Sequence, residues 1–470
     1  MMKKITFYLS ILLLLVPLCT LHSQNDTQAL AGSWIGSLKA GAISLRIIFN
    51  LTPAGQDSLT VTMDSPDQGV KNLKIGPATL ANGNLRILAL MMMGEYNGTL
   101  KNDTLINGTW KQAGQTFPLD LTKLREKFTL NRPQEPKRPL PYTEQEVTFH
   151  NQQANIDLAG TLTIPEGAGP FKAAVLITGS GAQNRDEELL GHKPFLVLAD
   201  RLTRNGIAVL RFDDRGVGKS KGSSINATSA DFATDVASAI DFLKKNPKIY
   251  PDKIGLIGHS EGGIIAPLVA SKKNIAFIVS LAGTGVPGDE IIFRQSADIS
   301  RASGLSENAI ADAVEINKKL FPILKDEKDN MKASEKMVSE YRKMLEGANT
   351  SEPEMEKSIQ QLKASLNPGS LTWLRYFIST DPALSWKKVK CPVLALNGDK
   401  DLQVAADVNL PAIEKALKAG GNKSVKTMKL PGLNHLFQHS ETGLPAEYGN
   451  IEETFSEDAL SIIYKWINSL

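Results

Sequence analysis

Beyond residue 146, short apolar runs alternate with segments of helical periodicity, and this alternation limits the possible folds more than any other feature of the sequence. The apolar runs lie at residues 173–177, 207–212, 254–257, 275–281 and 393–396. Helical segments separate them, as at residues 231–243, where Val236, Ile240 and Leu243 share one face. Strands that are apolar on both sides belong to parallel sheets covered by helices on both faces. We therefore predict an α/β domain over residues 144–470, built on a mostly parallel sheet.

A charged, helical stretch interrupts the alternation at about residues 289–382. Ile310, Val314 and Phe321 recur there near the spacing of a helix face. Because the stretch follows the run that ends at Leu281, we expect it above the carboxyl edge of the sheet, where open α/β sheets bind ligands. We predict a helical cap over a ligand site. An insertion without a role at the site is the alternative.

Residues 24–124 show the two-residue alternation of β-strands instead. Apolar side chains alternate with mostly polar ones at residues 45–51, 59–63 and 117–121. Such short strands bury one side by closing up or by pairing face to face, which predicts a small all-β, barrel-like domain. Residues 125–143 follow, and their high proline content predicts an extended linker.

Two tryptophans near the ends of the β domain share a short Gly-x-Trp pattern. The two copies are Gly32-Ser33-Trp34 and Gly108-Thr109-Trp110. The pattern resembles the one whose tryptophans plug lipocalin-like and avidin-like barrels. The resemblance implies that Trp34 and Trp110 fill the core, with contact to a ligand as the alternative.

The first 23 residues have the composition of a secretory signal peptide. Lys3 and Lys4 precede an apolar run at residues 11–16, which is shorter than the roughly 20 residues of a membrane span. We predict cleavage near Ser23 and a mature protein that is periplasmic or secreted, without a transmembrane segment. An uncleaved anchor and lipidation at Cys19 are the alternatives. Cleavage leaves Cys391 as a lone, buried packing residue, so no internal disulfide is expected.

The charge balance argues against nucleic acid as a partner. The chain has 53 basic and 50 acidic residues, with a formal net charge of +3. Binding to a polyanion needs a clustered basic excess. The sequence predicts a small-molecule partner and leaves the oligomeric state open.

The pattern Gly-x-Ser-x-Gly occurs twice, at residues 218–222 and 258–262. A nucleophilic serine in this pattern lies on a sharp turn between a strand and a helix. Ser260 meets that condition, because an apolar run precedes it and a helix-like stretch follows. Ser220 does not, since polar residues follow it. A phosphate-binding P-loop ending at Ser220 is excluded, because Asp213 stands where that loop needs glycine.

A serine hydroxyl needs a base and an acid that orients the base. His435 lies in a loop beyond the last predicted strand, and we prefer it as the base over His439. Asp401 follows the run at 393–396, and we prefer it as the acid over Asp399, which we expect to shape a turn. The order Ser260, Asp401, His435 matches one of the chain orders known for serine hydrolases.

The oxyanion formed in such a reaction needs two backbone N–H donors. We predict that Glu261, directly after the nucleophile, supplies one. Ser180, in the turn after the run at 173–177, should supply the other, because the glycines beside it let the backbone approach a substrate. A simple glycine turn is the alternative for residues 178–181.

Three motifs together resemble the exported bacterial carboxylesterases of the α/β-hydrolase superfamily. They are residues 178–187 (TGSGAQNRDE), 210–220 (LRFDDRGVGKS) and the turn at Ser260. The resemblance covers about residues 146–470 and implies an α/β-hydrolase fold and esterase activity without a metal or an organic cofactor. Thr178 departs from it, since many relatives have histidine there.

Charged residues in the first two motifs have other expected roles. Asp213, Asp214 and Arg215 should form a buried salt-bridge turn rather than touch substrate. The segment 185–187 (RDE) should be structural, with shaping of an acyl pocket as the alternative.

The sequence thus predicts a serine hydrolase that cleaves carboxylic esters through an acyl-enzyme. A serine peptidase similar to the prolyl oligopeptidases is the first alternative, although 95 residues of β structure cannot form their propeller. Transfer of the acyl group to an acceptor other than water is a second alternative. A non-catalytic binding protein whose β domain does the work is the third.

Overall fold

The structure is a computed structural model that describes residues 24–40, 43–54, 58–112 and 114–470. The predicted signal peptide, residues 1–23, lies outside the described residues. The chain divides into two units, with the main division after Phe128. None of the helices in the described part of the chain has the length and apolar character needed to cross a membrane.

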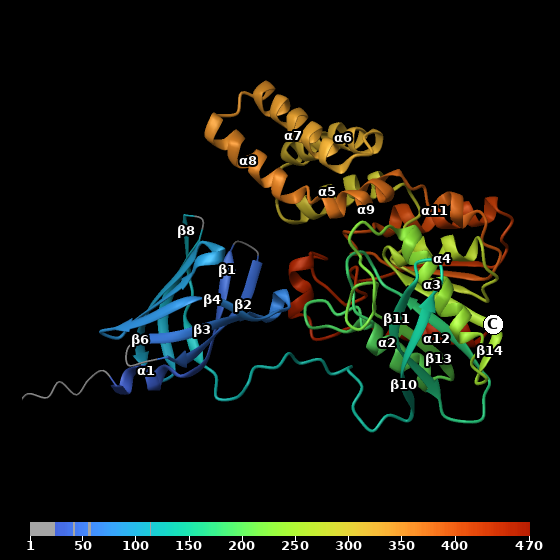
Figure 1. Cartoon of the computed structure of the whole chain (residues 1–470), viewed down its shortest axis with the longest axis horizontal. Coiled ribbons are helices and arrows are strands. Elements are labelled where there is room, and N and C mark those ends of the chain that lie inside the picture. The colour runs from blue at the N-terminus through green and yellow to red at the C-terminus, as the bar shows by residue number, and fades with distance from the viewer. Residues whose placement is uncertain (1–23, 41–42, 55–57, 113) are drawn as a thin grey trace, which may run out of the picture. The chain divides into compact units, whose positions relative to one another are not determined.

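The first unit is a closed β-barrel, drawn from blue to cyan in Figure 1. A short helix, α1 (Gln24–Leu30), precedes its strands. The strands are β1 (Gly32–Ala40), β2 (Ile43–Pro53), β3 (Ser58–Ser65), β4 (Val70–Ala81), β5 (Asn84–Ala89), β6 (Gly94–Asn102), β7 (Leu105–Gln112), β8 (Gln115–Pro118) and β9 (Leu121–Lys123). The first seven pair in sequence order, and β9 joins β7 to β1 and closes the ring, while β8 pairs with β7 alone. The predicted barrel-like domain is confirmed.

Aromatic side chains fill the barrel. Trp34, Phe49, Tyr96 and Trp110 are buried in one cluster, with ring centroids of Phe49 and Tyr96 5.6 Å apart. Trp34 Nε1 donates a hydrogen bond to the backbone oxygen of Leu30 at 2.8 Å. Both tryptophans of the Gly-x-Trp pattern therefore belong to the core, as predicted.

The proline-rich segment is more firmly held than an extended linker. From Thr129 onward it belongs to the second unit. The Arg132 guanidinium donates hydrogen bonds to the backbone oxygens of Leu190, Gly191, Gly449 and Ile451, at 2.9–3.2 Å. The prolines prevent regular structure, but these bonds fix the segment on the α/β unit.

The second unit contains an eight-stranded sheet. Its strands are β10 (Tyr142–Asn151), β11 (Ile156–Pro165), β12 (Phe171–Ile177), β13 (Ile207–Phe212), β14 (Ile249–His259), β15 (Ile278–Leu281), β16 (Val393–Gly398) and β17 (Val425–Leu430). Their order is β10-β11-β13-β12-β14-β15-β16-β17. The hairpin β10–β11 is antiparallel to its neighbour β13, and the other pairings are parallel.

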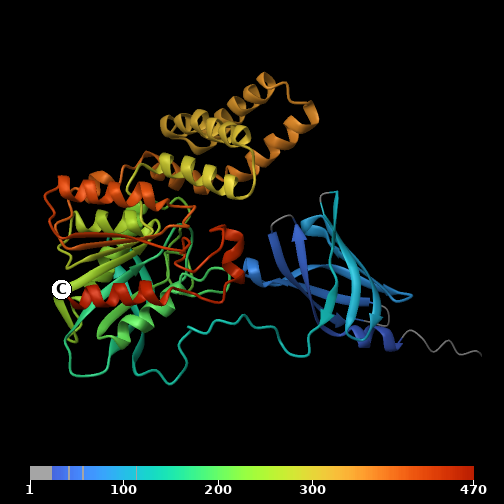
Figure 2. The same cartoon turned by 180° about the vertical axis from the view of Figure 1, so that it is seen from behind.

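Helices cover both faces of this sheet, as Figure 2 shows from behind. On one face lie α3 (Ser229–Leu243), α4 (Gly262–Ala270) and α11 (Ala406–Ala419). On the other lie α2 (Pro194–Arg204) and α12 (Glu457–Asn468). Each face has its own apolar core, which explains why the central strands are apolar on both sides. The predicted α/β fold is confirmed.

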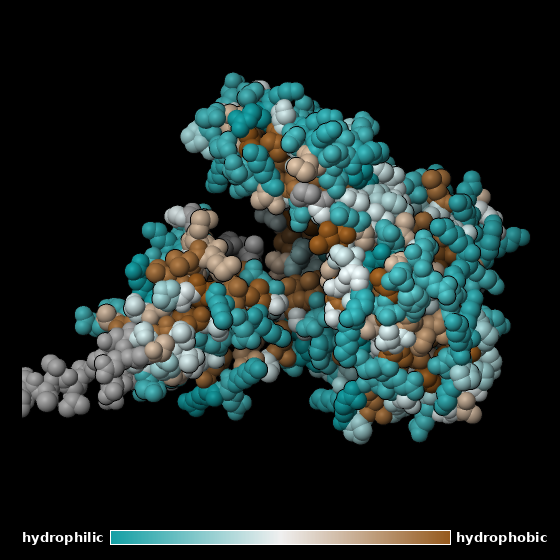
Figure 3. All heavy atoms as spheres, in the orientation of Figure 1, coloured by the Kyte–Doolittle hydropathy of each residue, from teal (hydrophilic) through white to brown (hydrophobic). Residues whose placement is uncertain are grey.

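A helical cap is inserted between β15 and β16. It comprises α5 (Gly288–Ala302), α6 (Glu307–Asp326), α7 (Asn330–Gly347), α8 (Glu352–Ser365) and α9 (Pro368–Ser379), and the short α10 (Ala383–Trp386) leads back to the sheet. The cap has a separate apolar core, which Ile264 of α4 and Val404 join from the sheet side. Figure 3 shows that its outer surface in this view is mainly hydrophilic. The cap thus packs on the sheet side through its own apolar core.

Candidate active site

Ser260 occupies a strained turn between β14 and α4. Its φ is +52°, a left-handed conformation that is unfavourable for any residue with a Cβ. The flanking glycines are required by close contacts, because a Cβ on Gly258 would lie 2.2 Å from the Gly262 backbone oxygen. A Cβ on Gly262 would lie 2.4 Å from the backbone oxygen of Ile177 in β12. The turn thus presents Ser260 at the carboxyl edge of the sheet, as a nucleophilic serine requires.

The loops after β16 and β17 bring Asp401 and His435 into contact. His435 Nδ1 lies 2.8 Å from Asp401 Oδ2, and both side chains are buried. The other carboxylate oxygen, Oδ1, accepts the backbone N–H groups of Gln403 and Val404 at 2.8 and 2.9 Å. Because a carboxylate only accepts hydrogen bonds, Nδ1 carries the proton and Nε2 of a neutral His435 is left to act as an acceptor.

Ser260 is connected to this pair through its neighbour His259. The Nε2 atom of His259 lies 3.0 Å from the backbone oxygen of His435, and the two ring centroids are 4.8 Å apart. Among the residues that the structure describes, the Ser260 hydroxyl has no hydrogen-bond partner, so the bond from Ser260 to His435 is not formed. Such bonds often tighten only when substrate is bound.

The rejected candidates have other partners. Asp399 Oδ1 accepts the Gly432 N–H at 2.7 Å and shapes the turn, as expected. His439 is exposed and pairs with Glu453 at 2.8 Å. Asp399 and His439 therefore have partners of their own, outside the Asp401–His435 pair.

Ser220, in the copy of the pentapeptide at residues 218–222, is a structural residue. Its hydroxyl donates to the backbone oxygen of Asp213 at 2.7 Å and accepts the Ala159 N–H at 2.9 Å. The side chain is buried, and both bonding directions of the hydroxyl are used. Ser220 therefore fixes the loop after β13 against β11.

The backbone of residues 178–181 lies beside Ser260. A Cβ on Gly179 would lie 3.3 Å from the Ser260 Cβ, so glycine permits this approach. Within the described ranges, the N–H groups of Ser180 and Glu261 have no acceptor in the protein. Two such free donors next to a serine Cβ are the arrangement that an oxyanion site needs.

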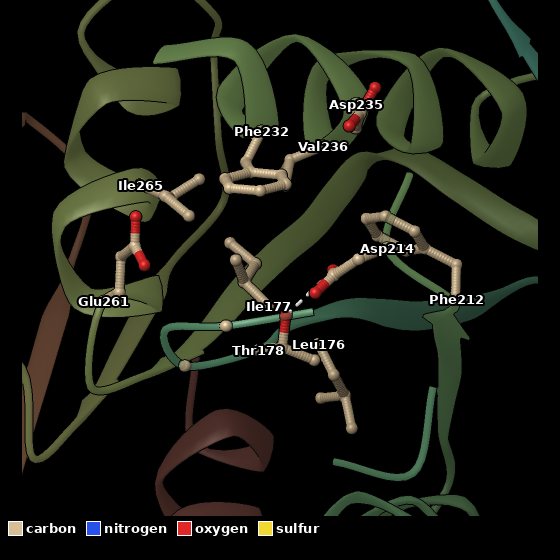
Figure 4. A pocket seen from close by; sticks show the side chains of 12 residues that line it. Leu176, Ile177, Thr178, Phe212, Asp214, Phe232, Asp235, Val236, Glu261 and Ile265 are labelled. Carbon is tan, nitrogen blue, oxygen red and sulfur yellow. Dashed lines mark hydrogen bonds between the residues drawn. The ribbon is translucent and has the colours of Figure 1, made fainter. Parts of the chain in front are cut away.

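Three buried carboxyl groups, those of Asp214, Asp235 and Glu261, line a small cavity beside this backbone, which Figure 4 shows. The cavity has a volume of about 10 Å³. Asp214 accepts hydrogen bonds from Thr178 Oγ1 at 3.0 Å and from the Gln183 N–H at 2.9 Å, and burial raises its pKa to about 8. Glu261 Oε1 accepts from Ser229 and from Trp373 of the cap, at 2.6 and 2.9 Å, and burial also raises the pKa of Glu261.

The salt-bridge turn predicted at residues 213–215 is only partly correct. Asp213 pairs with Arg185 at 2.8 Å, and Arg215 pairs with Asp235 at 2.8 Å. Asp214 has no cationic partner in the described residues. The three side chains of the turn point in different directions, so each finds its partner on another element.

The segment that contains Glu187 makes contacts at the site that the sequence does not predict. Arg185 and Asp186 anchor it, on Asp213 and Arg211 respectively. Glu187 instead turns inward, where its Oε1 accepts the Gly179 N–H at 2.6 Å and lies 2.9 Å from His259 Nδ1. Sequence reasoning missed this link, and the motif TGSGAQNRDE was the one available signal.

A groove of about 530 Å³ opens beside Ser180. Ala182, Ile225, Phe232 and the cap residue Trp373 give it apolar walls. The remaining lining residues are small or polar, and none of the described residues that line it is charged. The groove can therefore take an uncharged, largely apolar group.

Comparison with known protein families identifies relatives of the α/β unit. The sequence profile of the hydrolase family described as "Serine aminopeptidase, S33" matches residues 193–441, more than half of the chain. This range includes Ser260, Asp401 and His435.

Individual relatives are more distant. The chain is 24% identical to esterase EstD of Thermotoga maritima over 314 residues, which are 66% of this chain and 64% of EstD. It is 29% identical to the uncharacterized protein PA2218 of Pseudomonas aeruginosa over 136 residues, 28% of this chain and 35% of PA2218. The chain therefore spans less than two thirds of the length of these two relatives. Among solved structures, the esterase Pf2001 of Pyrococcus furiosus is 16% identical, with 73% of this chain and 99% of that chain covered and a TM-score of 0.42.

Proposed function

The chain belongs to the family described as serine aminopeptidase, S33, and on this premise we propose that it is a serine hydrolase that cleaves carboxylic esters through an acyl-enzyme. The observation that carries the proposal is the contact of His435 Nδ1 with Asp401, at 2.8 Å, beside the strained turn of Ser260. This combination supplies a nucleophile, a base and an acid at the carboxyl ends of three strands.

In the proposed reaction, Ser260 Oγ attacks the ester carbonyl and His435 Nε2 takes its proton. Asp401 holds the imidazole in the required tautomer and stabilises the imidazolium as it forms. His435 then returns the proton to the leaving alcohol, and the acyl group stays on Ser260. Water, activated by the same histidine, hydrolyses the acyl-enzyme and restores the serine.

The negative charge of the tetrahedral intermediate is placed at the backbone N–H groups of Ser180 and Glu261. Each such donor is worth about 3 kcal/mol of transition-state stabilisation in serine hydrolases. The side chain of Glu261 takes no part, because it is buried and bound to Ser229 and Trp373.

The groove beside Ser180 favours an ester over the substrate of an aminopeptidase. An aminopeptidase binds a free ammonium group, which needs a carboxylate close to the reacting carbonyl. None of the described residues that line the groove is charged. Peptidase activity is therefore the second candidate, supported by the family's description.

A substrate panel tests the proposal. We expect hydrolysis of p-nitrophenyl acetate and butyrate, covalent labelling of Ser260 by a fluorophosphonate, and no comparable cleavage of aminoacyl p-nitroanilides. Cleavage of the anilides with higher kcat/KM than of the esters would establish the peptidase instead. An unlabelled Ser260 in the folded protein would leave only a binding role.

Trp373 should limit the size of the group that the groove accepts. A Trp373→Ala variant removes the indole ring and enlarges the groove. Each added methylene of the substrate that can then be buried is worth about 0.8 kcal/mol, or roughly fourfold in kcat/KM. Measured over p-nitrophenyl esters of increasing length, the preference should move toward longer chains. An unchanged preference would place the acyl group elsewhere.

We also propose that the mature protein is exported after cleavage near Ser23. The basic start and short apolar run of residues 1–23 support this proposal. N-terminal sequencing of the protein from culture fractions tests it, and a retained Met1 would contradict it.

A further inference from the structure

Glu187 lies at an unusual position for a carboxylate. It has φ +50° and is 4% exposed, in the loop that follows β12. Non-glycine residues in this conformation are strained, and their strain is retained where the surrounding contacts fix it. The Oε1 atom accepts the Gly179 N–H at 2.6 Å and faces His259 Nδ1 at 2.9 Å. Glu187 thus holds the backbone next to Ser180.

His259 carries the connection further, to the loop of the predicted base. Its Nε2 lies 3.0 Å from the His435 backbone oxygen. A carbonyl oxygen and a carboxylate oxygen both act as acceptors, so each ring nitrogen of His259 carries a proton. His259 is therefore a cation paired with Glu187. Burial by itself lowers the pKa of His259, but the charge and hydrogen bond of Glu187, together with the His435 carbonyl and the charge of Asp401, raise it overall.

Folding stability alone does not account for the Glu187–His259 pair. Buried ion pairs lose much of their hydration and are often no better for stability than apolar packing. The second oxygen of Glu187, Oε2, is buried without a hydrogen-bond partner in the described part of the chain. The loop around Glu187 is already fixed by Arg185 on Asp213 and by Asp186 on Arg211.

We propose that Glu187, through His259, is a positioning residue that fixes the Ser180 N–H and the loop of His435 relative to Ser260. This inference rests on the proposed function. The connection runs from the Gly179 N–H to Glu187, to the His259 ring and to the His435 backbone oxygen. It joins the oxyanion loop, the nucleophile turn and the base loop, which lie far apart in the sequence.

The kinetic effect of losing Glu187 follows from the groups that the Glu187–His259 connection positions. Donors and base must lie within a few tenths of an ångström of their working positions, and small displacements reduce the rate of the chemical step strongly. Neither Glu187 nor His259 lines the groove, so substrate binding should change little. Loss of the charge should lower kcat and leave KM nearly unchanged.

The central variant is Glu187→Gln, which keeps the size of the side chain and removes the charge. We expect kcat for p-nitrophenyl acetate to fall about 10- to 100-fold, with KM changed by less than about threefold. The dissociation constant of an alkyl boronic acid, which mimics the tetrahedral intermediate, should rise by a similar factor. Glu188→Gln is the matched control, since Glu188 is adjacent and exposed and should keep wild-type kinetics.

Several outcomes would overturn the proposal. One is a Glu187→Gln protein with kcat within twofold of the wild type, and another is a loss confined to KM. Should Glu187→Gln not fold, His259→Gln replaces it, because glutamine can still donate to the His435 carbonyl but cannot pair with Glu187 as a cation. Retained kcat in that folded variant overturns the proposal too. Ser260→Ala is measured in parallel. If Ser260→Ala keeps its activity, the proposed function is refuted. If Ser260→Ala is inactive and Glu187→Gln is fully active, only the positioning role is refuted.

Discussion

The two Gly-x-Ser-x-Gly segments of this chain have the same pattern and opposite physical roles. At residues 258–262 the glycines are needed because the backbone of a neighbouring strand or turn passes within 2.4 Å of where a Cβ would be, and the serine takes the strained φ. At residues 218–222 both glycines have positive φ, +55° and +88°, and the serine is relaxed. The hydroxyl of Ser260 is without a partner in the described structure, whereas that of Ser220 makes two buried hydrogen bonds. A free hydroxyl on a strained turn can react, while a fully bonded one holds a loop.

The aspartates near the two segments differ in the same way. For Asp213, burial raises the pKa, but the hydrogen bonds and charge of Arg185 and the Lys219 N–H outweigh it and lower the pKa overall. The next residue, Asp214, has no such cation, and burial raises its pKa to about 8. Asp213 thus supports the Ser220 loop with a lowered pKa, whereas Asp214, which accepts a hydrogen bond from Thr178, has a raised one.

The largest expected effect comes from Ser260→Ala. Removing the nucleophile should lower kcat for p-nitrophenyl acetate by about 10³- to 10⁶-fold, as in other serine triads. Thermal unfolding should change little, because the hydroxyl has no hydrogen-bond partner among the described residues. Substantial activity in Ser260→Ala, combined with an inactive Ser220→Ala, would reverse the assignment of the two segments.

Asp401→Asn should come next. The amide cannot hold His435 in the required tautomer, and kcat should fall by about 10³- to 10⁴-fold. Asp399→Asn is the matched control, since the Asp399 carboxylate accepts the Gly432 N–H in the turn, and the variant should stay within about threefold of the wild type. A stronger effect at Asp399 than at Asp401 would exchange their roles.

Ser220→Ala should affect stability instead of chemistry. The substitution leaves the Ala159 N–H and the Asp213 carbonyl without their buried partner, at a cost of about 1–3 kcal/mol in the free energy of unfolding. Urea unfolding measures this loss, and kcat of the folded protein should stay near that of the wild type. Ser223→Ala, in the same loop but exposed, provides the comparison and should be close to neutral.

The last expected effect is a pH dependence of the free energy of unfolding, caused by Asp214. In the unfolded chain this carboxyl ionises near its ordinary pKa of 3.8, whereas in the folded protein its pKa is about 8. Between these values the unfolded state has lost a proton that the folded state keeps, so the contribution of Asp214 to the free energy of unfolding decreases as pH rises from about 4 to about 8. Asp214→Asn imitates the protonated form and should remove this decrease. Urea unfolding at pH 5 and pH 8 should therefore show a smaller difference in the variant than in the wild type, and equal differences would mean that Asp214 is ionised.

The sequence located the strand ends because the apolar pattern of a strand is a local property of the chain. Alternating apolar runs mark the parallel strands, and such strands place their carboxyl ends at one edge of the sheet. As partners of Ser260, His435 could therefore be preferred over His439, and Asp401 over Asp399. Links between loops were beyond this reasoning. Glu187 and His259 are 72 residues apart, and neither lies in a periodic pattern that would pair them.

By itself, the sequence determined that the chain forms a β-barrel and a capped α/β unit, because apolar periodicity decides which faces must be buried. It also distinguished two pentapeptides of the same pattern, since a strand and a helix surround only one of them. Tertiary structure alone decided which charges are paired, that Arg132 holds the proline-rich segment, and that Glu187 accepts the Gly179 N–H beside Ser260. Burial and ion pairing depend on groups that the fold brings together from distant loops, and no local sequence pattern predicts those contacts.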